Sequence, residues 1–509
     1  MKKPINQLRS GILLSYLNLA LGAVIPFIYT PLMLNLLGQA EYGLYSLSNS
    51  VIGYLTLLSF GFGTTIIRYI SKYRAEGKKR EEEETFGFFL LLYCVLALLV
   101  MVGGVILSAN ASNIFEKGLT DSEILKMRSL TLIMAFNTAL SFPLSVFSSM
   151  AIAHERYFFR KVMDIVSTAA VPIANLVALY LGFASVGMAL AGTVVQLLLA
   201  PISVGYCFRE LKLRPRFVKL PGSLVREMLG FSLFVFIATL VDMLFWATDK
   251  VILGMIASTS AVAVYNVGAT FNSIVTNPST SISGVLVPRI TGIVATHPRE
   301  AWTDIFIKVG RLQFIIVALI VSGFTVFGQA FVLLWAGAEY ASSYWVAVFT
   351  LFPMCIPLIQ STAKSIVVAQ NKHQFRSIVY LIIAVANVVA TYLVVPYMGV
   401  IGAALCSCVS YLLGQGVIMN IYYHKVTGLD IPLFWKNILQ MAVIPAVMLA
   451  VGLLLNHYIT IDNWFTFLVG VMLFTAVYAV SMYLFAMNDY ERDIIRKPLQ
   501  RILRVLCKR

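Results

Sequence analysis

Long apolar stretches, separated by short polar or charged segments, run the length of this chain. Fourteen of them are long enough to cross the roughly 30 Å hydrocarbon layer of a bilayer as α-helices. The sequence therefore predicts an all-α integral membrane protein with fourteen transmembrane helices. They are expected at residues 10–36, 43–70, 86–108, 127–152, 161–182, 184–207, 229–256, 262–290, 305–335, 343–369, 376–397, 399–422, 436–457 and 464–486.

The positive charges test this count independently, because cytoplasmic loops of membrane proteins are rich in lysine and arginine. With the N-terminus inside, the basic residues should fall in the two tails and in every second loop. All of the 38 lysines and arginines do so except Lys117, Lys126, Arg128 and Lys250. The pattern predicts that both termini are cytoplasmic, and it accounts for the net charge of +15 without nucleic acid.

The composition agrees with a chain that has lipid as much of its solvent. Hydrophobic residues make up 59% of the chain and charged residues 12%, against about 25% charged residues in soluble proteins. The six cysteines are scattered, mostly among apolar runs, which predicts neither a disulfide framework nor a metal site. The sequence contains no Gly-x-x-x-x-Gly-Lys-Ser/Thr loop for nucleotide hydrolysis. We therefore expect no cofactor.

An internal repeat divides the chain. Three short segments of the first half recur in the same order in the second half. The segment around Tyr45 recurs around Tyr265, the one around Pro143 around Pro357, and the one around Asn175 around Asn387. Each repeat holds six predicted spans, and an even number of crossings makes the two halves parallel repeats related by an axis along the membrane normal. We expect one six-helix bundle in residues 1–208, a second in 209–427, two added helices in 428–488, and a basic amphipathic cytoplasmic tail in 489–509.

Four segments together resemble the polysaccharide-transport flippases of the multidrug/oligosaccharidyl-lipid/polysaccharide exporter superfamily. They are residues 37–47 (LGQAEYGLYSL), 58–73, 153–157 and 249–265. The resemblance covers almost the whole chain and implies a MATE-like fold. It also implies a flippase that moves a polyprenyl-diphosphate-linked oligosaccharide from the inner to the outer leaflet of a bacterial inner membrane. Membrane lipids, and glycosyltransferases and a polymerase of the same pathway, would be its other partners.

A diphosphate headgroup needs cations within reach of the transport cavity, and two arginines occupy matching places. Arg68 ends the second predicted span and Arg289 ends the eighth, with nearly the same separation as Tyr45 and Tyr265. Two guanidinium groups at the cytoplasmic mouth would hold phosphate oxygens by paired hydrogen bonds. Ordinary basic residues at helix ends are the alternative.

Other charged candidates lie within predicted spans. Asp242 and Asp249 in the seventh span are seven positions apart, so they would share a helix face that lines the cavity. We predict ion coupling for these carboxylates and substrate binding for the adjacent Lys250, unless Asp242 is a structural hydrogen-bonding group and the other two mark a helix end. Lys364 in the tenth span is a further candidate for the headgroup, unless its side chain extends toward the cytoplasm.

Polar side chains within apolar spans would face the sugars. Tyr16 and Asn18 on the first span and Asn272 on the eighth offer an aromatic face and amide groups, although hydrogen bonds between helices explain such residues equally well. The acidic run at 81–84 follows three basic residues in a predicted cytoplasmic loop, and we interpret it as solvated surface.

Three alternative functions use the same features. A drug/cation antiporter of the superfamily usually has twelve spans and often a carboxylate in the first, whereas this first span has neither Asp nor Glu. A lipid II-type flippase would share the whole architecture. A membrane glycosyltransferase or polymerase would need an outer domain or an acidic metal cluster. The longest predicted outer loop covers only residues 109–126, so we expect no enzyme.

Overall fold

A computed structural model describes residues 7–218, 221–370, 372–458, 461–494 and 496–497. Every element in these ranges is a helix, which confirms the predicted all-α class. Eleven helices are long and apolar enough to cross a membrane, or twelve if the bent pair Ser343–Ile359 and Ser361–Ala369 forms one span. The protein is therefore a membrane protein with many spans.

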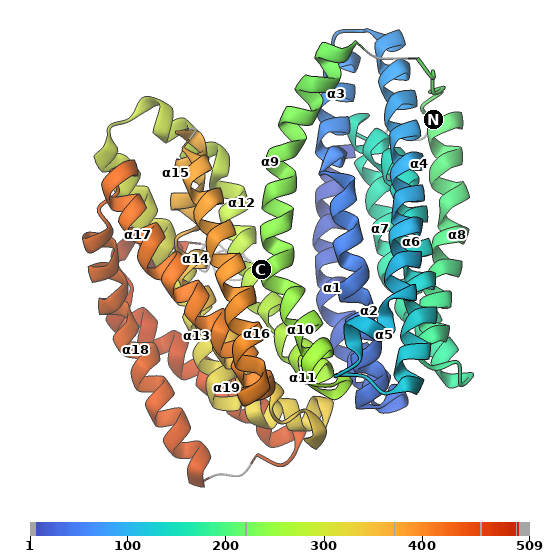
Figure 1. Ribbon diagram of the computed structural model, residues 1–509. Coiled ribbons are helices and arrows are strands. Elements are labelled where there is room, and N and C mark those ends of the chain that lie inside the picture. The colour runs from blue at the N-terminus through green and yellow to red at the C-terminus, as the bar shows by residue number, and fades with distance from the viewer. Residues whose placement is uncertain (1–6, 219–220, 371, 459–460, 495, 498–509) are drawn as a thin grey trace, which may run out of the picture. The chain divides into compact units, whose positions relative to one another are not determined.

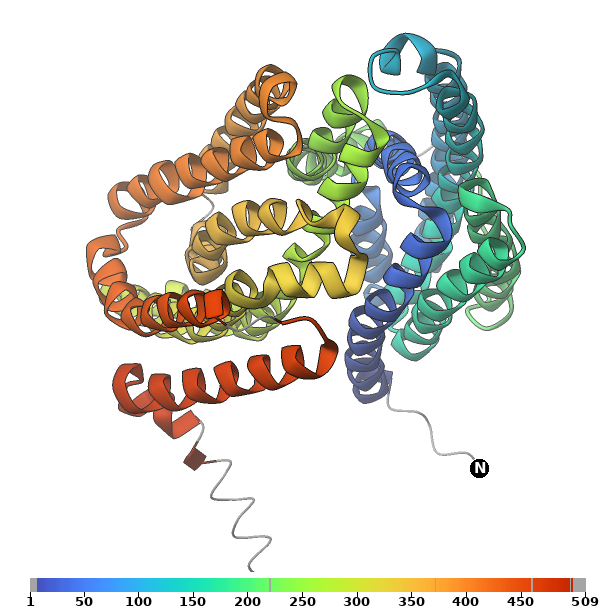
Figure 2. The same ribbon diagram turned by 90° about the horizontal axis from the view of Figure 1, so that it is seen from below.

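By the packing of its helices, the chain divides into two units, Met1–Ala263 and Val264–Arg509. In the first unit, α4 packs on α6, α6 on α8, α8 on α7 and α7 on α1 (Figures 1 and 2). Its helices are α1 (Gln7–Leu37), α2 (Gln39–Leu55), the 3₁₀ helix η1 (Thr56–Ser59), α3 (Phe62–Ala75), α4 (Lys79–Ala109), α5 (Ala111–Phe115), α6 (Asp121–Ala153), α7 (Tyr157–Tyr180), α8 (Ala184–Arg209), α9 (Gly222–Trp246) and α10 (Thr248–Ile256), and α11 (Thr259–Thr270) crosses the boundary.

The second unit is built around α13, which packs on α12, α14, α18 and α19. The last of these, in red, lies at the edge of the unit in Figure 2. The helices of this unit are α12 (Asn272–Thr296), α13 (Arg299–Ala336), η2 (Ala338–Tyr340), α14 (Ser343–Ile359), α15 (Ser361–Ala369), α16 (His373–Tyr411), the π-helix η3 (Leu412–Ile418), α17 (Met419–Tyr422), the π-helix η4 (Tyr423–Thr427), α18 (Ile431–Tyr458), α19 (Trp464–Ser481) and the π-helix η5 (Met482–Ala486).

The boundary between the units falls later than the one expected at residues 208/209, because α9 and α10 pack on the first unit. Ser232 on α9 shares a hydrogen bond of 2.7 Å with Thr65 on α3. A Cβ atom on Gly254 of α10 would lie 2.5 Å from the Leu47 side chain of α2. These contacts hold residues 222–256 against helices of the first repeat.

Interrupted helices explain why the expected and observed spans differ. The stretch Gln374–Thr427, which counts as one span, contains two helices that meet at a kink at Gly399 (φ 53°, ψ −135°), between the predicted spans 376–397 and 399–422. The predicted span 262–290 is divided between α11 and α12 at Phe271. The count of fourteen crossings therefore stays a prediction.

Gly43 lies in the segment that resembles the flippases, at the point where α2 meets the first residue of α11. A Cβ atom at this position would lie only 1.8 Å from the Thr259 carbonyl oxygen. Two residues earlier, the Glu41 carboxylate accepts hydrogen bonds from Lys126 Nζ at 2.6 Å and from Ser185 Oγ at 2.5 Å. The segment therefore joins α2 to α6, α8 and α11.

We expect Gly43→Ala to destabilise the protein by about 1–3 kcal/mol, the usual cost of overpacking a core. The cost arises because the obstructing atom belongs to the backbone, which cannot rotate away as a side chain can. Thermal unfolding of the purified protein in detergent measures the effect. Gly22→Ala on α1, where a Cβ atom meets nothing within 4 Å, is the control. Equal unfolding temperatures would show that α2 and α11 can separate without loss.

Candidate functional site

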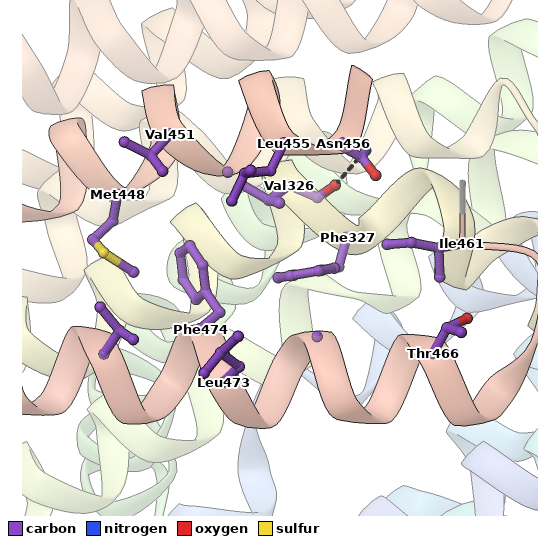
Figure 3. Close-up of a pocket in the computed structure, with 13 residues that line it drawn as sticks. Val326, Phe327, Met448, Val451, Leu455, Asn456, Ile461, Thr466, Leu473 and Phe474 are labelled. Carbon is purple, nitrogen blue, oxygen red and sulfur yellow. Dashed lines mark hydrogen bonds between the residues drawn. The ribbon is translucent and has the colours of Figure 1, made fainter. Parts of the chain in front are cut away.

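An apolar groove lies between α13, α18 and α19 in the second unit (Figure 3). Its volume is about 290 Å³. It is lined by Val326, Phe327, Met448, Val451, Gly452, Leu455, Asn456, Ile461, Thr466, Gly470, Leu473, Phe474 and Val477. No lining residue is charged.

Two glycines let α18 and α19 approach α13 closely enough to form this groove. A Cβ atom on Gly452 would lie 2.7 Å from Val326, and one on Gly470 would lie 2.9 Å from the Phe327 ring. The rings of Phe327 and Phe474 meet edge to face, with 5.6 Å between their centroids. Figure 3 shows both rings between the two red helices, so aromatic surface lies along the middle of the groove.

The two polar side chains of the groove already have partners within the protein. Asn456 Nδ2 donates to the Val326 carbonyl oxygen at 3.1 Å, drawn as a dashed line in Figure 3. Thr466 Oγ1 donates to the Asn463 carbonyl oxygen at 3.0 Å. Because its lining is otherwise apolar, the groove is suited to a hydrocarbon chain rather than to a sugar or a phosphate.

Different chemistry lies at the two ends of the groove along α13. Near one end, the Trp464 ring contacts Phe331 and Phe467, with 6.0 and 5.7 Å between the ring centroids. Such groups of aromatic side chains are typical of a membrane surface. Toward the other end, Arg311 forms a buried ion pair with Glu491, with 2.5 Å between Nε and Oε1. The groove therefore lies in the half of this helix group that contains the connection between α18 and α19, beside Trp464 and away from the ion pair.

The predicted site residues of the first unit lie on different helices. Arg68 on α3 is exposed, and its guanidinium carbon lies 4.8 Å from the centre of the Phe231 ring. Tyr16 on α1 is 64% exposed, so its ring is available to lipid or to a ligand. Asn18, also on α1, accepts a hydrogen bond from Thr168 Oγ1 on α7 at 3.2 Å, which is the helix-to-helix role considered for it.

The expectation that Asp242 and Asp249 share one helix face is wrong, because it assumed an unbroken helix. Asp242 belongs to α9 and Asp249 to α10, and the two helices are separated at Ala247. Asp242 is exposed, whereas Asp249 is completely buried. Lys250 is partly buried beside it. A role in ion coupling or substrate binding remains a prediction for each residue separately.

In the second unit, Asn272 is a buried member of the predicted site residues. It is 5% exposed, and its Oδ1 accepts a hydrogen bond from Thr350 Oγ1 at 3.0 Å. Its Nδ2 has no hydrogen-bond partner among the described residues. Lys364 is exposed on α15. Arg289 lies on α12, but its side chain is outside the described part of the chain, so the paired clamp with Arg68 stays a prediction.

The interpretation of residues 81–84 as solvated surface is wrong for two of them. Glu82 is 4% exposed and its carboxylate lies 2.6 Å from His154 Nε2 at the end of α6. Glu83 is 7% exposed and its carboxylate lies 2.8 Å from Arg216 Nε. Both partners are distant in the sequence, so no local pattern marks these carboxylates as buried. They hold the beginning of α4 to two other parts of the unit.

The fold is that of membrane transporters of the MOP superfamily. The lipid II flippase MurJ superposes with a TM-score of 0.74 at 14% sequence identity, covering 95% of this chain and 99% of its own. An inward-facing MATE multidrug transporter gives a TM-score of 0.64 at 13% identity, covering 82% of this chain and 98% of its own. These similarities confirm the MATE-like fold expected from the sequence.

The chain belongs to the polysaccharide biosynthesis protein family, whose profile matches residues 8–294. The membrane protein EpsK of Bacillus subtilis is 20% identical to it, over 93% of this chain and 94% of EpsK. The membrane protein MJ1068 of Methanocaldococcus jannaschii is 23% identical, over 79% of this chain and 80% of its own. The family resemblance seen in the sequence is confirmed.

Proposed function

We propose that the protein is a flippase that moves a polyprenyl-diphosphate-linked oligosaccharide, the repeat unit of a polysaccharide, from the inner to the outer leaflet by alternating access. The observation that carries this proposal is the apolar groove between α13, α18 and α19. A polyprenyl chain is a long hydrocarbon without hydrogen-bonding groups. A groove without charge at membrane depth would hold part of that chain while the headgroup crosses elsewhere.

The headgroup requires polar and cationic groups, which the candidate residues would supply. The proposed contacts are Arg68, Arg289, Lys250 and Lys364 for the diphosphate, Tyr16, Asn18 and Asn272 for the sugars, and Asp242 and Asp249 for a coupling ion. The unpaired amide nitrogen of Asn272 supports this assignment, because a buried donor gains most from a ligand acceptor.

The proposed topology has fourteen crossings, with two parallel six-helix bundles, two added helices and both termini in the cytoplasm of a bacterial cell. The distribution of lysine and arginine supports it. Glycosyltransferases and a polymerase of the same pathway would supply and consume the lipid-linked oligosaccharide on the two sides of the inner membrane.

A lipid II-type flippase is the second candidate, and the fit to MurJ favours it. A drug/cation antiporter fits less well. The inward-facing MATE transporter covers 82% of this chain, whereas MurJ covers 95% of it. In addition, α1 contains no Asp or Glu. The groove is formed largely by helices of the 428–488 segment, which would have no role in an antiporter of twelve spans.

We expect the double variant Arg68→Ala/Arg289→Ala to lower the initial flipping rate about 10- to 100-fold, because hydrogen bonds to charged groups contribute about 1.5–3 kcal/mol. The rate is measured in proteoliposomes as the appearance of lipid-linked oligosaccharide in the leaflet accessible to an impermeant glycan-cleaving enzyme. The control is Arg80→Ala, which removes an exposed arginine paired with Glu84 at 2.9 Å.

Protein-dependent movement of the oligosaccharide would support flipping, and its loss in the double variant alone would support the phosphate clamp. Movement that is restricted to lipid II would favour the second candidate. If no glycan type moves but organic cations are exported, the antiporter is correct and the proposed function is wrong.

A further inference from the structure

Residues 211–218, which follow α8, are fixed against the beginning of α4. Leu213 is 2% exposed and belongs to the hydrophobic core of the first unit. The Arg216 backbone N–H donates to the Glu83 carbonyl oxygen at 3.0 Å, and its guanidinium contacts the Glu83 carboxylate at 2.8 Å. Gly87 permits this approach, since a Cβ atom there would lie 2.2 Å from the Arg216 carbonyl oxygen. The segment therefore forms a fixed wall.

This wall borders a groove of about 660 Å³ whose other sides are α4 and α9. The groove is lined by Gly87, Phe88, Leu91, Phe217, Val218, Gly222, Val225, Arg226 and Leu229. Its larger apolar side chains are open to the surroundings, with Phe217 65%, Leu91 55% and Leu229 50% exposed. Arg226 is the one charged side chain in the lining. An apolar surface beside a single cation matches a lipid with an anionic headgroup.

The charge around the groove is also positive. Residues 209–227 carry six basic and two acidic side chains, so the local field attracts an anion. Lys212 and Arg214 are exposed on the same segment as the wall. Arg216, in contrast, is paired with Glu83 and positions the wall rather than the ligand. The predicted location is the cytoplasmic surface, where the leaflet contains anionic lipids.

We propose that this groove binds an anionic glycerophospholipid of the phosphatidylglycerol or cardiolipin class. One acyl chain lies on the apolar side chains of α4 and α9, and the phosphate contacts Arg226. The lipid is a resident of the surrounding bilayer and is not transported. It holds the wall of residues 211–218 and the beginning of α9 against α4 at the membrane surface.

The test is native mass spectrometry of the full-length protein in mild detergent with equal amounts of phosphatidylglycerol and phosphatidylcholine. The wild-type protein is expected to retain phosphatidylglycerol about fivefold more than phosphatidylcholine, the preference that one basic side chain gives at an anionic surface. Arg226→Ala should abolish this preference. Gly222→Trp should lower the retention of both lipids by filling the groove, and a Cβ atom at Gly222 meets nothing within 4 Å.

Two matched variants serve as controls. Gly230→Trp adds the same indole to α9 at a position equally free of neighbours but outside the groove, and Arg209→Ala removes an arginine at the end of α8. Both should bind lipid as the wild type does. Undiminished phosphatidylglycerol retention in Arg226→Ala, whose side chain is exposed, would overturn the proposal. So would displacement of phosphatidylglycerol by an equimolar polyprenyl diphosphate, since the groove would then serve the transported lipid. The readout is independent of transport, so it stands apart from the flipping assay.

Discussion

Filling the groove between α13, α18 and α19 is expected to stop transport and leave the protein folded. Leu455→Trp on α18 and Leu473→Trp on α19 each place an indole ring in the groove, from different helices (Figure 3). Leu455 is 51% exposed and Leu473 64% exposed, so a larger side chain at either position does not overpack the core. We expect the initial flipping rate to fall at least about tenfold, or about 1.4 kcal/mol, because the polyprenyl chain loses its binding surface.

The chain offers a control next to each of these positions. Leu454 on α18 is 61% exposed and Met472 on α19 is 65% exposed, yet neither lines the groove. Leu454→Trp and Met472→Trp therefore make the same addition on the lipid-facing surface, and their flipping rates should stay within about twofold of wild type, less than about 0.5 kcal/mol. If all four variants flip at the wild-type rate, the groove has no part in transport.

The sequence was sufficient to predict the helices but not every point at which they are interrupted. Apolar runs of the required length mark each transmembrane segment, because a helix in lipid must satisfy its backbone groups internally. The bend of 46° between α14 and α15 at Gln360 occurs within one such run. Phe271 likewise separates α11 from α12 within the predicted span 262–290, whereas the break at Gly399 falls between two predicted spans. Such breaks depend on packing against neighbouring helices, which hydropathy does not record.

The candidate site was predictable only in part, for a related physical reason. Charged residues in apolar spans are visible in the sequence, and Asp249 is indeed buried. Its neighbours are not visible, since they come from other helices. The groove depends on three helices, two of which are distant from α13 in the sequence. Its one local signal is the presence of Gly452 and Gly470 within the last two apolar spans.

Breaking the buried ion pair between Arg311 and Glu491 should have the largest effect on stability. Arg311 is 8% and Glu491 1% exposed at the side chain, and the second contact, from Nη2 to Oε2, measures 2.9 Å. The same guanidinium donates to the Ala486 carbonyl oxygen at 3.0 Å. Arg311→Met or Glu491→Gln leaves the other partner buried without compensation. Each change should cost about 3–5 kcal/mol, measured as a lower unfolding temperature in detergent.

The double variant Arg311→Met/Glu491→Leu separates the loss of the pair from the loss of one partner. The double variant should regain most of the free energy of unfolding that each single variant loses, because apolar replacement of a whole buried pair is often neutral. Asp304→Asn removes the exposed partner of Lys308 on the same helix and should cost only about 0.3–0.5 kcal/mol. Glu491 also accepts a hydrogen bond from the Asn488 backbone N–H at 3.0 Å. The single variants should therefore make the peptide bond after Arg492 more susceptible to cleavage by trypsin. Single variants as stable and as protease-resistant as wild type would mean that apolar contacts of α13 alone hold the beginning of the C-terminal tail.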